Sequence, residues 1–148
     1  MVTPSDLSGS FKNRSSMYNQ IDTMIRAAES TITIVSTEQG IVRKLETFKR
    51  SLKKAADRGV QIRVAAPISE EAKKLAREFS GILEVRETDG ARARFIVVDG
   101  QELAFMLLDD QDVHPNFDVG IWVNTPFFAA ALEELFELAW KEMEVVQA

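Results

Sequence analysis

The chain has 148 residues, of which 45% are hydrophobic and 28% charged, and its formal net charge is −5. These values predict one soluble globular domain with a hydrophobic core. The sequence contains no cysteine, which excludes disulfides, thiolate metal sites and cysteine nucleophiles. It shows no secretory signal and no apolar run near the roughly 20 residues that span a bilayer. We therefore expect a cytoplasmic protein with no membrane partner, and nothing in the composition requires a cofactor.

The first 14 residues differ in composition from the rest of the chain. Residues 1–14 contain Pro4, Gly9 and several serines, which is typical of a flexible leader or connector. The predicted domain therefore covers residues 15–148.

From residue 15 onward, helical and strand patterns alternate. Apolar residues spaced three and four apart predict a helix that begins at Ser15, and β-branched residues predict a strand over 31–37. A second amphipathic helix is expected over about 41–58, where Arg58-Gly59 is a stop signal. A second strand follows over 60–66.

The second half of the chain consists mainly of predicted strands joined by short turns. Ser69 predicts the start of a third helix, and Thr125-Pro126 predicts the start of the last one. Asp99-Gly100 is a tight-turn signal. The strands expected in this half cover residues 82–88, 91–99, 102–109 and 118–124.

This order of elements predicts an α/β fold with a mixed, mostly parallel sheet flanked by helices. Strands that alternate with helices favour parallel crossovers, whereas strands joined by short turns favour antiparallel pairing. Ligand sites in such sheets lie at the carboxyl ends of the strands. Ser36 and Thr37 stand at the end of the first predicted strand.

A short motif lies in the strand "RARFIVVDG", residues 92–100. The pattern Arg92-x-Arg94-x4-Asp99 resembles the His-x-Lys-x4-Asp motif of the phospholipase D superfamily, with arginines in the His and Lys positions. The segment Asn116-Phe117-Asp118 resembles that superfamily's Asn-x-Glu segment. The similarity covers roughly residues 15 to 145 and implies a phospholipase D-like half-domain.

The substitution at position 92 removes the nucleophile that the resemblance would imply, whereas Arg94 can still hold an anion. In the superfamily the histidine attacks phosphorus, which requires a ring nitrogen with a free lone pair. A guanidinium stays protonated and has no lone pair for attack, so Arg92 cannot act as the nucleophile. The only histidine, His114, lies off the motif in a polar loop. We therefore expect no catalysis; the alternative is a dimeric phospholipase D-like phosphodiesterase or nuclease.

The stretches "RFIVVDG", "GIWVNTP" and "LEELFELAW" resemble the phospholipase D-like regulatory domain of TrmB-type archaeal transcription regulators. This resemblance implies a non-catalytic domain for effector sensing and dimerisation. It also implies that DNA is bound through a separate winged-helix domain, which this chain does not contain. The chain has one copy of the motif, so the resemblance further implies a homodimer that brings two copies face to face, with Arg92 and Arg94 near the two-fold axis.

Arg92 and Arg94 have two interpretations that can coexist. They can pair with acidic residues, for which the sequence offers Glu38, Asp99, Asp109 and Asp118. They can instead bind a small anionic metabolite such as a phosphate or carboxylate. In the second case the ligand-binding residues are Arg92, Arg94, Ser36, Thr37 and Asn116.

Charge is unevenly distributed along the chain. Residues 1–94 carry 17 basic and 12 acidic residues, and residues 95–148 carry one basic and 11 acidic residues. The basic side chains of the 41–58 helix predict a solvated face, with nucleic-acid contact as the alternative. Arg63 and Arg86 alternate with apolar neighbours and are expected to face solvent.

Overall fold

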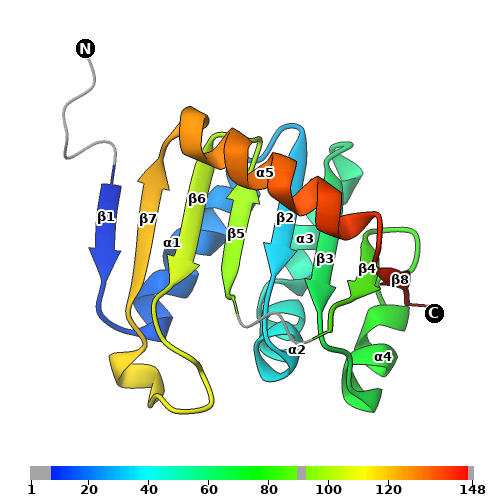
Figure 1. Cartoon of the computed structure of the whole chain (residues 1–148), viewed down its shortest axis with the longest axis horizontal. Coiled ribbons are helices and arrows are strands. Elements are labelled where there is room, and N and C mark those ends of the chain that lie inside the picture. The colour runs from blue at the N-terminus through cyan, green and yellow to red at the C-terminus, as the bar shows by residue number, and fades with distance from the viewer. Residues whose placement is uncertain (1–7, 90–92, 147–148) are drawn as a thin grey trace.

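The computed structural model describes residues 8–89 and 93–146. They form one open sheet of eight strands in the order β1-β7-β6-β5-β2-β3-β4-β8. Helices α1 to α4 cover one face, and α5 crosses the other (Figure 1). The strands are β1 Ser8–Phe11, β2 Thr31–Val35, β3 Gln61–Ala66, β4 Glu84–Glu87, β5 Phe95–Val98, β6 Glu102–Met106, β7 Gly120–Asn124 and β8 Glu144–Val145. The helices are α1 Arg14–Ala27, α2 Glu38–Thr47, α3 Lys49–Asp57, α4 Glu70–Arg77, the 3-10 helix η2 Pro115–Phe117 and α5 Pro126–Trp140.

The sheet is mixed, as the sequence predicts, but it is not mostly parallel. Only β2–β3 and β3–β4 pair in parallel, and the other pairs among the described strands are antiparallel. The prediction gave too much weight to the helix crossovers in the first half. After β4 the chain returns to the centre of the sheet, where β5 pairs antiparallel with β2. A tight turn, with Asp99 and Gly100 at positive φ values of 56° and 63°, then leads into β6.

Strand alternation divides the core between the two faces of the sheet. Ile34 and Ile96 belong to the large core beneath α1 to α4. Val35 and Ala65 point the other way and pack against Phe136 of α5. This follows from the two-residue period of a strand, and it also decides on which face each arginine of the sheet lies.

Most predicted strands are shorter in the structure, and two predictions differ in kind. The helix expected over 41–58 is two helices, α2 and α3, because the backbone of Phe48 leaves the helical region at φ −100° and ψ 11°. Phe48 is buried, so the apolar period continues through the break and conceals it in the sequence. Within the predicted leader, β1 pairs antiparallel with β7. Backbone hydrogen bonds make that pairing, and small residues such as Gly9 do not prevent it.

Candidate functional site

Buried and half-buried charged and polar side chains gather on the α1–α4 face, where β2 ends and β5 begins. They come from the end of β2, the first turns of α1 and α2, and the segments that flank β5 and β7. We call them the polar cluster: Arg14, Ser36, Thr37, Arg43, Lys44, Arg94, Asp110 and Asp118.

The centre of the polar cluster is the ion pair between Arg94 and Asp118. The side chains are 1% and 0% exposed. Arg94 Nη1 donates to Asp118 Oδ2 at 2.9 Å and Nη2 donates to Oδ1 at 2.7 Å, which is the two-point geometry that guanidinium and carboxylate favour. Arg94 Nη2 also donates to the Leu108 carbonyl oxygen. Asp118 is one of the four acidic partners that the sequence offered, so the pairing interpretation is confirmed for Arg94.

Asp118 binds a second arginine. Arg14, at the start of α1, donates from Nε to Asp118 Oδ2 at 2.8 Å. Burial of the Asp118 carboxyl by itself raises its pKa, but the hydrogen bonds from Arg94 and Arg14 outweigh burial and lower the pKa below its usual value. The carboxylate therefore stays ionised and joins the first turn of α1 to the segment before β7.

Asp110 forms the second acidic point of the cluster. Its Oδ2 accepts a hydrogen bond from Thr37 Oγ1 at 2.7 Å and lies 3.4 Å from both terminal nitrogens of Arg43. Thr37 also accepts from the backbone N–H of Gly40 and so caps α2. A Cβ on Gly40 would lie 2.4 Å from Ser36 Oγ, so this helix start requires a glycine for close packing.

Lys44 is the least expected member of the polar cluster. It is 2% exposed, its Nζ donates to Ser36 Oγ at 3.0 Å, and it lies 5.6 Å from the centre of the Tyr18 ring. Burial, together with the neighbouring charges of Arg94 and Arg43, lowers the pKa of Lys44 to about 7. Near neutral pH this amine therefore exchanges readily between its charged and neutral forms.

The polar cluster holds more basic than acidic groups. Four basic side chains, Arg14, Arg43, Lys44 and Arg94, share two carboxylates. Among the described residues, Arg94 Nε and Asp110 Oδ1 are buried and have no hydrogen-bond partner. The buried charged members, Lys44, Arg94, Asp110 and Asp118, balance in number, and the surplus comes from the half-buried Arg14 and Arg43. This surplus and the unpaired N–H of Arg94 are chemically suited to an anion.

The other residues of the motif have different surroundings. Arg92 lies outside the described residues. The Asp99 carboxylate accepts from the backbone N–H groups of Glu29, Ser30 and Thr31 at 2.7–3.3 Å, so it anchors the start of β2. Asn116 is exposed in η2, and among the described residues no hydrogen bond joins its side chain to the polar cluster.

The loop histidine, His114, is exposed. The Nδ1 of His114 accepts from the backbone N–H of Asn116 at 3.1 Å, so its role is to cap η2. The structure thus brings Ser36, Thr37 and Arg94 into one cluster and leaves Asn116 at the surface.

Sequence reasoning missed Arg14, Arg43, Lys44 and Asp110. A signal was available for Lys44: it follows Ile41 by three residues and precedes Phe48 by four, so it lies on the buried side of α2. For Asp110, in an irregular loop, periodicity offers no signal.

The basic face predicted along 41–58 is partly occupied by contacts within the protein. Arg43 and Lys44 belong to the polar cluster, Lys49 pairs with Glu78, and Arg58 donates to the Ile25 and Ala28 carbonyl oxygens. Arg50, Lys53 and Lys54 remain from the row, which is less than a continuous nucleic-acid-binding stripe provides.

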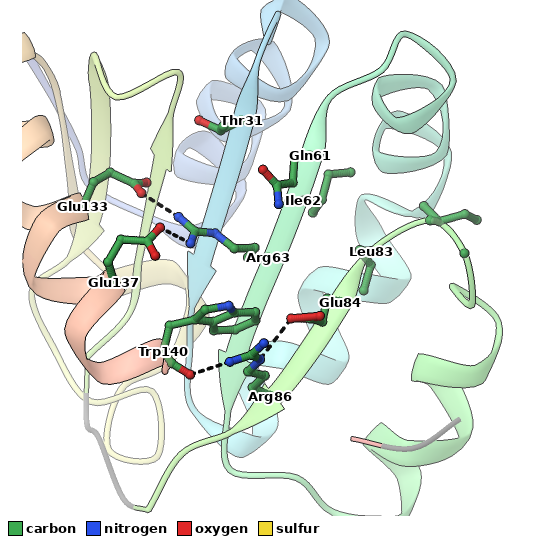
Figure 2. A pocket seen from close by; sticks show the side chains of 12 residues that line it. Thr31, Gln61, Ile62, Arg63, Leu83, Glu84, Arg86, Glu133, Glu137 and Trp140 are labelled. Atoms are coloured by element: carbon green, nitrogen blue, oxygen red, sulfur yellow. Dashed lines mark hydrogen bonds and ion pairs between the residues drawn. The ribbon is translucent and has the colours of Figure 1, made fainter. Parts of the chain in front are cut away.

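Arg63 and Arg86 do not face solvent, contrary to the prediction. Both lie beneath α5 on the opposite face of the sheet, beside a cleft of about 690 Å³ (Figure 2). Arg63 pairs with Glu133 at 2.8 Å and with Glu137, and Arg86 lies 4.4 Å from the ring centre of Trp140. The two arginines do alternate with apolar neighbours along β3 and β4, but α5 covers the face of the sheet on which they lie.

The described part of the chain shows neither a metal site nor a membrane-crossing helix. Across residues 8–89 and 93–146, no three His, Cys, Asp or Glu side chains are grouped so that they could hold a metal ion. Over the same residues, every helix is too short or too polar to cross a membrane.

Comparison with known proteins identifies similar sequences and folds. The family model described as "Transcriptional regulator TrmB, EBD N-terminal subdomain" matches residues 10–147. The structure of TrmBL2, an archaeal chromatin protein with a novel mode of DNA binding, superposes with a TM-score of 0.75 at 19% identity. That match covers 97% of this chain and 56% of TrmBL2, so the chain spans little more than half of this relative.

Two further solved structures match this chain over nearly their whole length. Nuc from Salmonella typhimurium, a phospholipase D family member, has a TM-score of 0.70 at 12% identity, with 95% of this chain and 99% of Nuc covered. NucT from Helicobacter pylori has a TM-score of 0.74 at 10% identity, with 93% and 98% covered. At such identities the likeness shows the phospholipase D-like fold alone. No curated protein matches the chain in sequence.

Proposed function

The chain belongs to the family of TrmB effector-binding domains, N-terminal subdomain, and from this premise we propose that it is the effector-sensing and dimerisation domain of a transcription regulator. Its role is non-catalytic, and DNA is bound by a separate winged-helix domain of the regulator in the cytoplasm. The observation that carries the proposal is the polar cluster, which stands at the motif position and groups four basic side chains around two carboxylates.

Catalysis lacks a nucleophile at the motif. Arg94 is committed to Asp118 and to the Leu108 carbonyl oxygen, and a guanidinium at position 92 cannot attack phosphorus. His114 is exposed and caps η2. The fold shared with Nuc and NucT favours the rival assignment, a phosphodiesterase. Turnover of bis-p-nitrophenyl phosphate well above buffer, lost in Arg92→Ala, would establish the enzyme and refute the sensor.

The proposed effector is a small anionic metabolite that carries a phosphate or carboxylate group. Lys44 and Arg94 supply the charge, together with Arg92, and Ser36 and Thr37 supply neutral hydrogen bonds. Because Arg94 and Asp118 enclose each other, an anion that binds Arg94 must take the place of the Asp118 carboxylate. Displacement of Asp118 frees Arg14 and Arg94 at once, which gives the site two discrete states.

A thermal-shift screen tests the effector site. Inorganic phosphate, sugar phosphates, nucleotides and carboxylates are added to the purified chain, and a ligand at 100 times its dissociation constant is expected to add about 2.7 kcal/mol of stability. Lys44→Met should abolish the shift, whereas Lys54→Met, which removes an exposed lysine of α3, should retain it. If no compound raises the melting temperature, the effector site is refuted.

We propose that the chain dimerises through the surface beside the polar cluster, where β2 ends and β5 begins. Leu107, Leu108 and Phe117 are 52%, 48% and 69% exposed beside it, and large exposed apolar side chains favour association. A two-fold axis there places the two copies of Arg92 and Arg94 near each other, as a regulator with a palindromic site requires. The variant Phe117→Glu should weaken this contact, and an unchanged mass in light scattering would count against it.

A further inference from the structure

Lys44 is a buried amine without an acidic partner. Its side chain projects from α2 and is enclosed by the protein. Its Nζ donates to Ser36 Oγ, a neutral acceptor, at 3.0 Å, and within the part of the chain that the structure describes it forms no ion pair. A buried ammonium normally pairs with a carboxylate, because removal of its charge from water is costly. The position of Lys44 therefore favours the neutral amine.

The ionisable groups around Lys44 come from several elements of the fold. They are Tyr18 of α1, Arg43 of α2, Arg94 before β5, and Asp110 and Asp118 between β6 and β7. Burial has the largest effect on the pKa of Lys44 and lowers it; the two arginines lower it further, and the two carboxylates raise it. The resulting pKa is about 7, so near pH 7 about half of the chains hold an uncharged, nucleophilic amine at this position.

The polar cluster also has room in its charge balance for one more carboxylate. When Lys44 is neutral, the three arginines of the cluster share two carboxylates. Arg94 Nε is buried and has no hydrogen-bond partner among the described residues. Arg43 reaches Asp110 only at 3.4 Å, and its side chain is 25% exposed, so its guanidinium can turn toward a nearer acceptor. A negative group on Lys44 would give each arginine a carboxylate of its own.

We propose that Lys44 is a modification site that reacts reversibly with carbon dioxide and then carries a carbamate. The neutral Nζ attacks the carbon atom of carbon dioxide, a new N–C bond forms, and one N–H proton leaves to water. The product, Nζ–COO⁻, requires no oxidant, reductant or further reactant. Carbon dioxide is small and uncharged, so it reaches the buried amine when the structure opens locally. Arg43 and Arg94 then supply the guanidinium groups that hold the new carboxylate.

The carbamate also regulates the proposed effector site, and this second statement rests on the proposed function. Carbamate formation turns Lys44 from a group that attracts an anion into an anion. It also occupies arginines that the effector would otherwise bind. Carbon dioxide should therefore weaken the binding of phosphate to the polar cluster, whereas formation of the carbamate itself does not depend on any effector.

Carbon-13 NMR of the intact chain tests the modification. The protein is equilibrated with ¹³C-labelled bicarbonate in a sealed tube at about pH 8, where most of the Lys44 amine is neutral. We expect a carbamate resonance that is separate from those of bicarbonate and dissolved carbon dioxide and that disappears when carbon dioxide is removed. Lys44→Met should lose this resonance. Lys54→Met, which removes an exposed lysine of α3, should keep it.

A chemical trap provides a readout that needs no variant. Carbamates on the unaltered protein are alkylated with a trialkyloxonium salt, and peptide mapping by mass spectrometry then locates the label. Label on Lys44 with only traces on Lys54 supports the proposal. An NMR spectrum without a carbamate resonance overturns it, and so does equal labelling of the two lysines, which would indicate a reaction of surface amines in general.

A competition experiment separates this proposal from the effector site. The concentration of inorganic phosphate that gives half of the thermal shift is measured with bicarbonate and with nitrate, a planar anion of the same charge that cannot form a carbamate. We expect bicarbonate, and not nitrate, to raise this concentration several-fold. A phosphate shift in a chain that forms no carbamate overturns the modification and leaves the proposed function intact. A carbamate on Lys44 without any phosphate shift supports the modification and refutes the effector site. A carbamate together with equal effects of bicarbonate and nitrate overturns the regulatory link.

Discussion

Two arginine–carboxylate groups lie on opposite faces of the same sheet and differ in almost every physical respect. Arg94 and Asp118 are completely enclosed, and a second arginine and a lysine lie close by. Arg63, beneath α5, is 12% exposed, and its partner Glu137 is 47% exposed. The Arg63 guanidinium also stacks 5.0 Å from the ring centre of Phe136. In the polar cluster the carboxylates are fewer than the basic side chains. Beneath α5, Arg63 has two carboxylate partners, and one of them is in contact with water.

This difference shows why the same residue type has different uses in one fold. A half-exposed pair gains little from its charges and loses little when one is removed. An enclosed pair stabilises the fold only while both partners are present. The polar cluster is therefore the region where loss or arrival of one negative charge has a large effect, which is the property that a sensor of anions needs.

The largest expected effect tests the enclosed pair. Asp118→Ala leaves Arg14 and Arg94 without their carboxylate, and we expect a loss of about 3–5 kcal/mol in the free energy of unfolding. Urea denaturation measures it. In the double variant Asp118→Ala/Arg94→Met the loss should be smaller than the sum of the two single losses. A loss below about 1 kcal/mol would mean that water reaches the pair and that the two regions do not differ.

Gly40→Ala tests close packing in the same region without any change in charge. The added Cβ would lie 2.4 Å from Ser36 Oγ and 2.8 Å from Thr37 Oγ1, so α2 must shift away from the polar cluster. We expect a loss of about 2 kcal/mol, as for other overpacked positions. Gly9→Ala is the control: its Cβ would have only ordinary contacts, the nearest at 3.5 Å. Equal losses in the two variants would contradict the tight packing at Gly40.

Lys44 gives the polar cluster a pH dependence of its own. Its pKa in the folded chain is about 7, below the usual value of 10.5. Between these values the unfolded chain binds a proton that the folded chain does not, so stability rises with pH. Relative to Lys44→Met, the unaltered protein should gain about 1 kcal/mol per pH unit at the steepest point between pH 7 and 10. Melting curves of both proteins at several pH values test this; a constant difference would refute it.

The smallest effect is expected beneath α5. Glu137→Ala removes one of two carboxylates beside Arg63 and leaves Glu133 in place at 2.8 Å, so we expect a loss below about 1 kcal/mol. The same urea titration measures it. A loss as large as that of Asp118→Ala would remove the distinction between the two regions.

Part of this structure follows from sequence reasoning. Periodicity gives the order of helices and strands. A buried arginine needs acidic partners, and the four acids named on that ground include Asp118, the partner of Arg94. Periodicity does not give strand order, because the central pair joins β2 to β5 although Ile32 and Val98 lie far apart in the sequence. It also failed for Arg63, since only the path of α5 decides whether that face of β3 is covered. Lys44 could have been found, had its spacing been given more weight than its charge.

Asp99 has a consequence for the folding of the chain. Its carboxylate binds backbone N–H groups that lie 68–70 residues earlier, so no local turn or hairpin can satisfy it. The contact forms only after the two ends of this long loop meet, a step that slows folding in topologies rich in distant pairings. If the contact forms after the transition state, it slows unfolding and does not accelerate folding. In that case Asp99, which the sequence presents as part of a reaction motif, sets the rate at which the folded sheet opens.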